Sequence, residues 1–406
     1  MEDMKKNLTV NTIKNKKTDY GALSLKLHEE NHGKISVVSK VPIRTRNDLS
    51  IAYTPGVAEP CLRIAKNKCD VYKYTSKGNL IAVITDGTAV LGLGDIGPLA
   101  SLPVMEGKAI LFKQFADIDA IPIAIASKDV DEIVNTVRLI SPALGGVNLE
   151  DISAPRCFEI EERLKKELDI PIFHDDQHGT AIVILAGLIN SLRLANKNIA
   201  NVKIVISGAG AAGVATAKLL MKYGAKNIIL VDSLGALYEG RTDNMNSTKI
   251  EMSKVTNFGK EKGGLKEALQ KADIFIGVSA AGILKPDMIK TMNKNPIIFA
   301  MANPTPEIMP EDALSAGAFI VATGRSDFPN QINNVLAFPG LMKGSLKVRA
   351  KEVNDKMKIA AAEALSRMVK EPSREKIIPE PFDKDIAKTV TEAVMTAAKK
   401  TGVNRI

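Results

Sequence analysis

Short apolar runs alternate with longer amphipathic stretches along most of the chain. The short runs are rich in β-branched residues and have the length of buried strands. Strands that alternate with helices are typical of an α/β fold with mostly parallel sheets. The predicted strands fall into two groups, residues 81–85, 121–126 and 170–173 in the first half and residues 202–207, 227–231, 273–278, 297–302 and 318–322 in the second.

Two groups of strands predict two α/β domains, which we place at residues 1–173 and 174–406. A helix is predicted over residues 130–140, between two strands of the first group. Residues 179–198 are apolar and then polar, which predicts a helix that connects the two domains.

An alanine-rich helical tail is predicted over about residues 345–406. Four apolar positions share one face of its last helix, and Gly402 follows as a stop signal. This face consists of Ile386, Val390, Val394 and Ala397. We expect the tail to pack on a preformed domain and to carry no chemistry.

Composition favours an enzyme of the cytoplasm that binds small anions. The 406 residues carry a formal net charge of +9, but basic residues form no long block, aromatic residues make up only 4% and Trp is absent, so we expect no nucleic-acid partner. The longest apolar run, residues 181–189, is about half the ~20 residues of a membrane span, so we expect no membrane. The first 20 residues lack the apolar core of a signal peptide, and the three cysteines form no CxxC pair.

A glycine motif opens the second domain. The predicted strand 202–207 runs into Gly208-x-Gly210-x-x-Gly213 and then into a helix. This order indicates a Rossmann-type domain in which the helix N-terminus binds the pyrophosphate of NAD or NADP. The predicted cofactor-binding residues are the three glycines together with Ala209, Ala211, Ala212 and Asp232. A glycine-rich turn without a ligand is the alternative.

Asp232 ends the next predicted strand, 19 residues after Gly213, where a ribose-binding carboxylate is expected. An acid here favours NAD because it repels the 2′-phosphate of NADP. However, Arg241 and Lys249 follow in the same loop and could pair with that phosphate. The sequence therefore leaves the choice between NAD and NADP open, with a slight preference for NAD.

Acidic residues follow two predicted strands of the first domain. Glu150 and Asp151 follow one strand, and Asp175 and Asp176 follow the other. Carboxylates that converge at the ends of parallel strands repel one another unless a cation lies between them, and oxygen ligands select Mg²⁺ or Mn²⁺. Zinc bound by His174 and His178 is a weaker alternative because no HExxH motif is present. A solvated loop or helix cap without metal is the structural alternative.

Two further titratable residues lie in motifs rather than in isolation. Tyr53 lies in AYTPGVAEPC, and Lys108 lies in MEGKAILFK. Either side chain can act as a general acid or base where its surroundings shift its pKa. Without context, an ordinary amphipathic Tyr and a snorkelling Lys are the simpler interpretations.

These motifs together resemble the malic enzymes of the short microbial type over nearly the whole chain. The resemblance rests on DLSIAYTPGVAEPC, AVITDGTAVLGLGDIG, PVMEGKAILFKQFADIDAIPI, GGVNLEDISAPRCFEIE, IFHDDQHGTA, SGAGAAG, MANPTPE and GRSDFPNQINNVLAFPG. It implies oxidative decarboxylation of (S)-malate to pyruvate and CO₂ with reduction of NAD or NADP. It also implies that the first domain binds malate and metal, that the second binds the dinucleotide, and that the chain forms a homodimer.

The resemblance implies specific roles for the site residues. Tyr53 would be the general acid that protonates enolpyruvate, and Lys108 the base that takes the hydroxyl proton of malate. Glu150, Asp151 and Asp176 would bind Mg²⁺ or Mn²⁺, and Asp175 would orient Lys108. Asn303 and Asn334 would bind malate, with Asn333 as the alternative to Asn334.

One position departs from the family pattern. Longer animal-type members carry an Arg in the loop after the TDG strand, where it pairs with a malate carboxylate, but here Ala89 stands at the apparent equivalent. The sequence therefore leaves open which residue binds this carboxylate of malate. Two other classes share parts of the pattern: a metal-independent amino-acid dehydrogenase would leave the acids unexplained, and a non-catalytic dinucleotide sensor would not need Tyr53 or Lys108.

Overall fold

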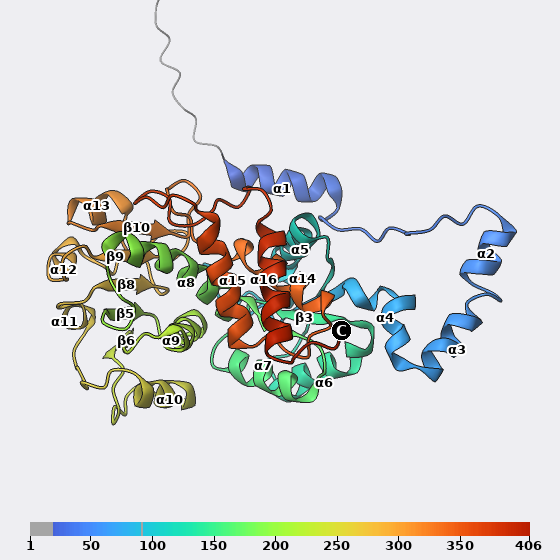
Figure 1. Cartoon of the computed structure of the whole chain (residues 1–406), viewed down its shortest axis with the longest axis horizontal. Helices are drawn as coiled ribbons and strands as arrows, with labels where there is room; N and C mark the ends of the chain where they lie inside the picture. Colours follow the sequence, from blue (N-terminus) through green and yellow to red (C-terminus); the bar gives the residue numbers. More distant parts are fainter. Residues whose placement is uncertain (1–18, 91) are drawn as a thin grey trace, which may run out of the picture.

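The computed structural model describes residues 19–90 and 92–406. Two mostly parallel sheets lie side by side, and helices of the C-terminal segment cover the region where they meet (Figure 1). The predicted α/β class is confirmed. The expectation of no signal peptide concerns mainly residues 1–18, which lie outside the described residues.

The first sheet has four parallel strands in the order β2-β1-β3-β4. Their side chains are mostly aliphatic, and β1, β3 and β4 are buried on both faces, as is usual for parallel strands covered by helices. The strands are β1 (Leu80–Thr85), β2 (Asp119–Ala124), β3 (Gly146–Leu149) and β4 (Ile172–His174).

The second sheet has six strands in the order β10-β9-β8-β5-β6-β7. The strand of this sheet that comes first in the sequence is β5. It lies between β8 and β6, so the strand order reverses beside it. Open α/β sheets bind ligands at such a switch point. The strands are β5 (Lys203–Ser207), β6 (Asn227–Asp232), β7 (Gly235–Ala236), β8 (Ile274–Gly277), β9 (Ile297–Ala300) and β10 (Ile320–Thr323), of which only β7 is antiparallel.

The helix α8 (Asp175–Ala195) connects the two sheets and lies in the main apolar core. It begins four residues before the predicted helix, directly after β4, and it ends where Asn196 adopts a left-handed conformation. By length and composition α8 could span a membrane, but 72% of the relevant window is buried inside the protein. We therefore interpret α8 as a core helix.

The remaining helices cover the sheets and form the C-terminal segment. The helix predicted over residues 130–140 is confirmed as α6. The helices are α1 (Tyr20–Asn31), α2 (Arg46–Ala52), α3 (Ala58–Lys66), α4 (Val71–Tyr74), α5 (Gly97–Ala116), α6 (Val130–Ile140), α7 (Arg156–Glu167), α9 (Ala211–Tyr223), α10 (Ser247–Val255), α11 (Leu265–Ala268), α12 (Pro286–Ile289), α13 (Pro310–Ser315), α14 (Phe338–Lys347), α15 (Asp355–Met368) and α16 (Ile386–Lys400).

The C-terminal segment packs against both halves of the molecule. The predicted apolar face of α16 is buried, and α16 packs on α14 and α15. Helix α15 contacts α8, and α14 contacts α5 of the first sheet, where the rings of Phe338 and Phe112 meet edge to face at 4.7 Å. The tail therefore fixes the position of α5 relative to α8.

Helices α2 and α3 form an arm that projects away from both sheets, and α4 leads from it back to the body of the molecule (Figure 1). We use the name N-terminal arm for residues 35–75. Large apolar side chains on it are exposed to solvent, among them Val37, Val38, Ile51 and Leu62. A single chain leaves this apolar surface uncovered.

Candidate active site

Three carboxylates meet at the carboxyl ends of β3 and β4. Glu150 follows β3, and Asp176 lies in the first turn of α8 after β4; the two strands are paired in parallel, with Leu149 opposite His174. One oxygen of each of Glu150, Asp151 and Asp176 lies within 4.8 Å of the others. The structure thus brings together the three residues expected to bind metal.

The backbone holds this carboxylate cluster in place. Asp151 adopts a left-handed conformation with φ of 53°, and its N–H donates to Asp176 Oδ2 at 2.8 Å. The side chain of Asn148 donates to Glu150 Oε2 at 2.8 Å. Asp151 Oδ2 is buried and lacks a hydrogen-bond partner among the described residues, which points to an absent ligand at this position.

The three carboxyl groups resist ionisation in the absence of a cation. Burial raises the pKa of Glu150 to about 8, with repulsion from Asp176 adding to the effect and Lys108 opposing it. Burial followed by repulsion from Glu150 raises the pKa of Asp151 to about 7, and burial followed by repulsion from Asp151 does the same for Asp176. A bound cation would stabilise all three charges, so the donor set and its electrostatics fit a hard divalent metal.

Lys108 lies buried on α5 beside this cluster. Its Nζ is 2.6 Å from Asp175 Oδ2 and 2.8 Å from Glu150 Oε1, and it lies 4.3 Å from the ring centre of Phe338. Burial alone would lower the pKa of Lys108, but the charges of Asp175 and Glu150 outweigh it and raise the pKa above the ordinary value. The ammonium form is therefore favoured while both carboxylates remain charged.

Asp175 connects Lys108 to the loop before α14. Its carboxylate is completely buried, and the side-chain amide of Asn334 donates to the same oxygen that accepts from Lys108. The side chain of Asn333 instead accepts a hydrogen bond from Val335 N–H and caps the short turn there. A Cβ on Gly179 would lie 1.8 Å from Asp175 Oδ1, so only glycine fits at that position of α8.

The glycine loop lies between β5 and α9. Gly208 has a φ of +115°, and a Cβ on Gly213 would lie 1.8 Å from the carbonyl oxygen of Gly208. Nothing lies within 4 Å of a Cβ built on Gly210. The open approach at Gly210 and the free N-terminus of α9 fit a dinucleotide pyrophosphate.

Asp232 is not free at the end of β6. Its carboxylate accepts hydrogen bonds from Arg241 at 2.7 and 2.8 Å, from Lys249 Nζ at 2.7 Å and from Asn244 at 3.1 Å. Burial would raise the pKa of Asp232, but the hydrogen bonds from Lys249 and Arg241 outweigh it and lower the pKa. Two basic side chains thus surround the one carboxylate.

One cavity of about 960 Å³ joins these parts of the molecule. The carboxylate cluster and Lys108 line it on one side, and the glycine loop lines it on the other. Asn303, which follows β9, and both Asn333 and Asn334 also line it. The expected residues outside its lining are Tyr53, Asp175, Gly208, Ala209, Gly213 and Asp232.

Tyr53 lies apart from the other expected catalytic residues. It follows α2 on the N-terminal arm and is 65% exposed. The described chain therefore does not bring Tyr53 to Lys108.

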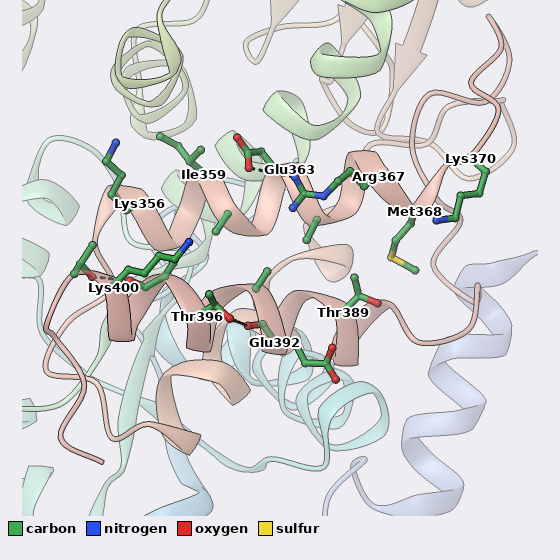
Figure 2. Close-up of a pocket in the computed structure, with 15 residues that line it drawn as sticks. Lys356, Ile359, Glu363, Arg367, Met368, Lys370, Thr389, Glu392, Thr396 and Lys400 are labelled. Atoms are coloured by element: carbon green, nitrogen blue, oxygen red, sulfur yellow. Dashed lines mark hydrogen bonds and ion pairs between the residues drawn. The ribbon is translucent and has the colours of Figure 1, made fainter.

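A second cavity of about 1100 Å³ is a groove between α15 and α16 (Figure 2). Its walls carry Lys356, Glu363, Arg367, Glu392 and Lys400, together with threonine, alanine and methionine side chains. Neither the carboxylate cluster nor the glycine loop contributes to it.

The zinc alternative lacks support within the described residues. His174 ends β4 and is buried, whereas His178 lies on α8 and forms a 2.8 Å contact with Glu161. Burial lowers the pKa of both imidazoles, to about 4 for His174 and about 3 for His178. The one described group of side chains with metal-binding geometry contains neither histidine.

Sequence reasoning missed residues from α1 and the segment that follows it. Ser24, His28 and Lys34 line the cavity between the sheets, although none belongs to a motif that was singled out. Lys34 reaches the cavity through contacts with α5, 69 residues further along the chain. A local sequence pattern cannot predict a contact between residues so far apart in the chain.

Comparisons with known proteins agree with this geometry. Residues 32–165 match the family profile described as "Malic enzyme, N-terminal domain", and residues 177–399 match "Malic enzyme, NAD binding domain". The chain is 60% identical to a bifunctional malic/malolactic enzyme of Bacillus subtilis over 94% of both chains. It is 54% identical to an NAD-dependent malic enzyme of Geobacillus stearothermophilus, over 92% of this chain and 78% of that one.

Solved structures show the same similarity. A malic enzyme from Pyrococcus horikoshii superposes with a TM-score of 0.91 at 47% identity, over 94% of this chain and 92% of that chain. An NAD-dependent malic enzyme from Thermotoga maritima superposes with a TM-score of 0.89 at 49% identity, over 91% of this chain and 98% of that chain.

Proposed function

Because this chain belongs to the malic enzyme family and is thus an NAD- or NADP-dependent oxidoreductase, we propose that it converts (S)-malate to pyruvate and CO₂ with a divalent metal. The observation that carries this proposal is the buried Lys108, which lies between Asp175 and Glu150 at the edge of the carboxylate cluster. An amino-acid dehydrogenase or a dinucleotide sensor would have no use for this combination.

The proposed metal ligands are Glu150, Asp151 and Asp176. Their oxygens lie within 4.8 Å of one another, their pKa values are raised, and one buried oxygen of Asp151 lacks a partner among the described residues. When bound, Mg²⁺ or Mn²⁺ would supply Lewis-acid stabilisation of negative charge that develops on the substrate. The chain contributes the fixed oxygens and a cavity between the two sheets.

Lys108 is the proposed base for the hydroxyl proton of malate. It must be neutral to accept that proton, and the structure shows what opposes this: two carboxylates within 2.8 Å favour the ammonium form. Neutralisation of Glu150 would remove one of the two charges and lower the pKa of Lys108. Asp175 then remains to orient Lys108, and Asn334 holds Asp175 in place.

The dinucleotide would lie along the glycine loop. A bound dinucleotide would supply the hydride acceptor for the oxidation of malate. Gly210, Ala211 and Ala212 line the same cavity as Lys108, so this loop faces the proposed malate site. Asn303 lines the cavity between them and is a proposed malate ligand together with Asn334.

Cofactor choice depends on the basic residues around Asp232. The acid was expected to bind ribose hydroxyls, but its carboxylate already accepts hydrogen bonds from Arg241, Lys249 and Asn244. Two cations around one carboxylate leave an excess of positive charge where a 2′-phosphate would lie. We therefore propose that this site accepts NADP as well as NAD.

Tyr53 is proposed to act in a second copy of the chain. It remains our candidate for the acid that protonates enolpyruvate, yet it is exposed on the N-terminal arm. A homodimer in which each arm covers its partner would bury the exposed apolar side chains of the arm and place Tyr53 near the partner's cavity. The homodimer and this role of Tyr53 belong to one proposal.

The remaining assignments follow from the same proposal. We place the boundary between the malate and metal domain (1–173) and the dinucleotide domain (174–406) where β4 passes into α8. The partner molecules are small, with neither nucleic acid nor membrane among them. We place the protein in the cytoplasm, since the three cysteines are unpaired.

A direct assay tests this function. The purified chain is incubated with (S)-malate, Mn²⁺ and either NAD or NADP, and the reduced cofactor, pyruvate and lactate are measured. We expect pyruvate and reduced cofactor in equal amounts, and no turnover after chelation of the metal. Lactate without reduced cofactor in solution would contradict oxidative release of pyruvate, and metal-independent turnover would contradict the metal site.

A further inference from the structure

The proposed substrate brings two carboxylates into a cavity that already contains several. Glu150, Asp151 and Asp176 line it, and Asp175 lies directly behind Lys108. A divalent cation and Lys108 together do not balance four protein carboxylates, so the dianion needs further positive charge. The question of which residue provides it rests on the proposed function.

Few cationic side chains reach this cavity. Of the described residues that line it, His28, Lys34 and Lys108 are the ones with a basic side chain. Lys108 is already bound to Glu150 and Asp175. His28 Nδ1 lies 2.7 Å from the carbonyl oxygen of Ser24, so this nitrogen already has a partner within α1.

Arginines near the cavity are already paired. Arg156 forms a 2.9 Å ion pair with the buried Asp86. Arg325 forms two hydrogen bonds, at 2.6 and 2.8 Å, with Asp327. Among the described residues that line the cavity, Lys34 is therefore the lysine whose Nζ contacts a carbonyl oxygen rather than a carboxylate.

Lys34 is held against α5 by contacts of its backbone and of its side chain. Gly33 has a φ of +101°, and a Cβ there would lie 3.0 Å from a carboxylate oxygen of Glu106. The N–H of Lys34 donates to Glu106 Oε2 at 2.7 Å, and its Nζ donates to the carbonyl oxygen of Pro103 at 2.6 Å. The same Nζ lies 3.5 Å from the point where a Cβ of Gly107 would be, and Lys108 is the next residue.

The ammonium group of Lys34 can donate more hydrogen bonds than it forms within the described residues. It carries three N–H donors, and the carbonyl of Pro103 is the acceptor found for it among residues 19–90 and 92–406. Partial burial lowers the pKa of Lys34, and the charge of Glu106 only partly opposes this. An anionic ligand beside Lys34 would stabilise its ammonium form, which partial burial destabilises.

We propose that Lys34 binds the carboxylate of malate that is remote from the hydroxyl group, and so selects dicarboxylates over monocarboxylates. This carboxylate leaves as CO₂, so its charge is lost during the reaction. It is still charged while malate is oxidised, so an interaction with it stabilises the bound substrate and the transition state of oxidation alike. Lys34 therefore lowers KM for malate without raising kcat.

The test compares Lys34→Met with Lys34→Arg and with Lys26→Ala, a matched control on α1 whose lysine pairs with Glu30 at 3.7 Å. Loss of one charge-assisted hydrogen bond predicts that Lys34→Met raises KM for malate about ten- to a hundredfold, with kcat within about twofold of wild type. Lys34→Arg should recover part of this loss, and Lys26→Ala should behave as wild type.

The remote carboxylate is isolated with a second ligand. Lactate has the hydroxyl and adjacent carboxylate of malate but lacks the other carboxylate, so its competitive inhibition constant should be the same in wild type and Lys34→Met. KM for the dinucleotide should also be unchanged, and circular dichroism should show the same fold. An unchanged KM for malate, or an equal loss for lactate, would overturn the role of Lys34. Absence of malate turnover in the wild type would instead overturn the proposed function.

Discussion

Metal binding to the carboxylate cluster should depend steeply on pH. A cation binds the ionised carboxylates, and the pKa values of Glu150, Asp151 and Asp176 are raised to about 8, 7 and 7. For each proton with a pKa near 7 that the cation displaces, affinity falls about tenfold between pH 8 and pH 6. One such proton gives a tenfold loss, and release of all three gives a loss on the order of a thousandfold.

The same shifts set the stability of the metal-free protein. Each carboxyl group has a higher pKa in the folded chain than in the unfolded chain, where it is about 4. Its contribution to the free energy of unfolding is fully present below pH 4 and is lost as the pH rises through 7 to 8. Added metal should therefore stabilise the protein more at pH 8 than at pH 6. At a hundred times Kd the gain is about 2.7 kcal/mol, and a tenfold weaker Kd reduces it to about 1.4 kcal/mol.

Calorimetric titration with Mn²⁺ at pH 6, 7 and 8 measures the affinity, and thermal unfolding followed by circular dichroism measures the gain in stability. Asp151→Asn should weaken Mn²⁺ binding about a hundredfold or more, because it removes a proposed ligand. Glu159→Gln is the control, since its carboxylate lies on α7 and is largely exposed. Equal Mn²⁺ affinity at pH 6 and pH 8, or wild-type affinity in Asp151→Asn, would refute the reasoning.

Three further predictions concern catalysis and cofactor choice. Lys108→Met should lose at least about a thousandfold in malate oxidation while it still binds the dinucleotide, as measured by NADH fluorescence; activity near the wild-type rate would exclude Lys108 as the base. Tyr53→Phe should also be nearly inactive. A mixture of Tyr53→Phe and Lys108→Met chains should recover about a quarter of wild-type activity. Half of the randomly paired dimers are mixed, and one of the two sites in each mixed dimer is intact. No recovery after confirmed exchange of subunits would argue against a shared site. Lys249→Gln should lower kcat/KM for NADP about tenfold or more and leave that for NAD nearly unchanged; an equal loss for both would remove Lys249 from cofactor choice.

The strands and the glycine loop could be predicted from the sequence because they depend on local patterns. A buried parallel strand is a short apolar run, and the observed β1 (Leu80–Thr85) differs from its prediction by one residue. The glycine loop could be recognised because its turn and its close helix contact tolerate no side chain, as Gly208 and Gly213 show. Acids after neighbouring parallel strands had to lie at one edge of the sheet, so the approach of Glu150 to Asp176 also followed from the sequence.

Tertiary structure alone decided the contacts between distant elements. Lys108 on α5 lies 2.6 Å from Asp175 at the start of α8, and the turn before α14 directs Asn334 rather than Asn333 toward that carboxylate. The same kind of packing brings Lys34 to the cavity. Within one loop, the chain after β6 folds back so that Arg241 donates to Asp232, nine residues before it. The packing also leaves Tyr53 exposed on the arm. A local pattern records which face of an element is apolar, whereas the partner of a polar side chain depends on how whole helices and strands pack.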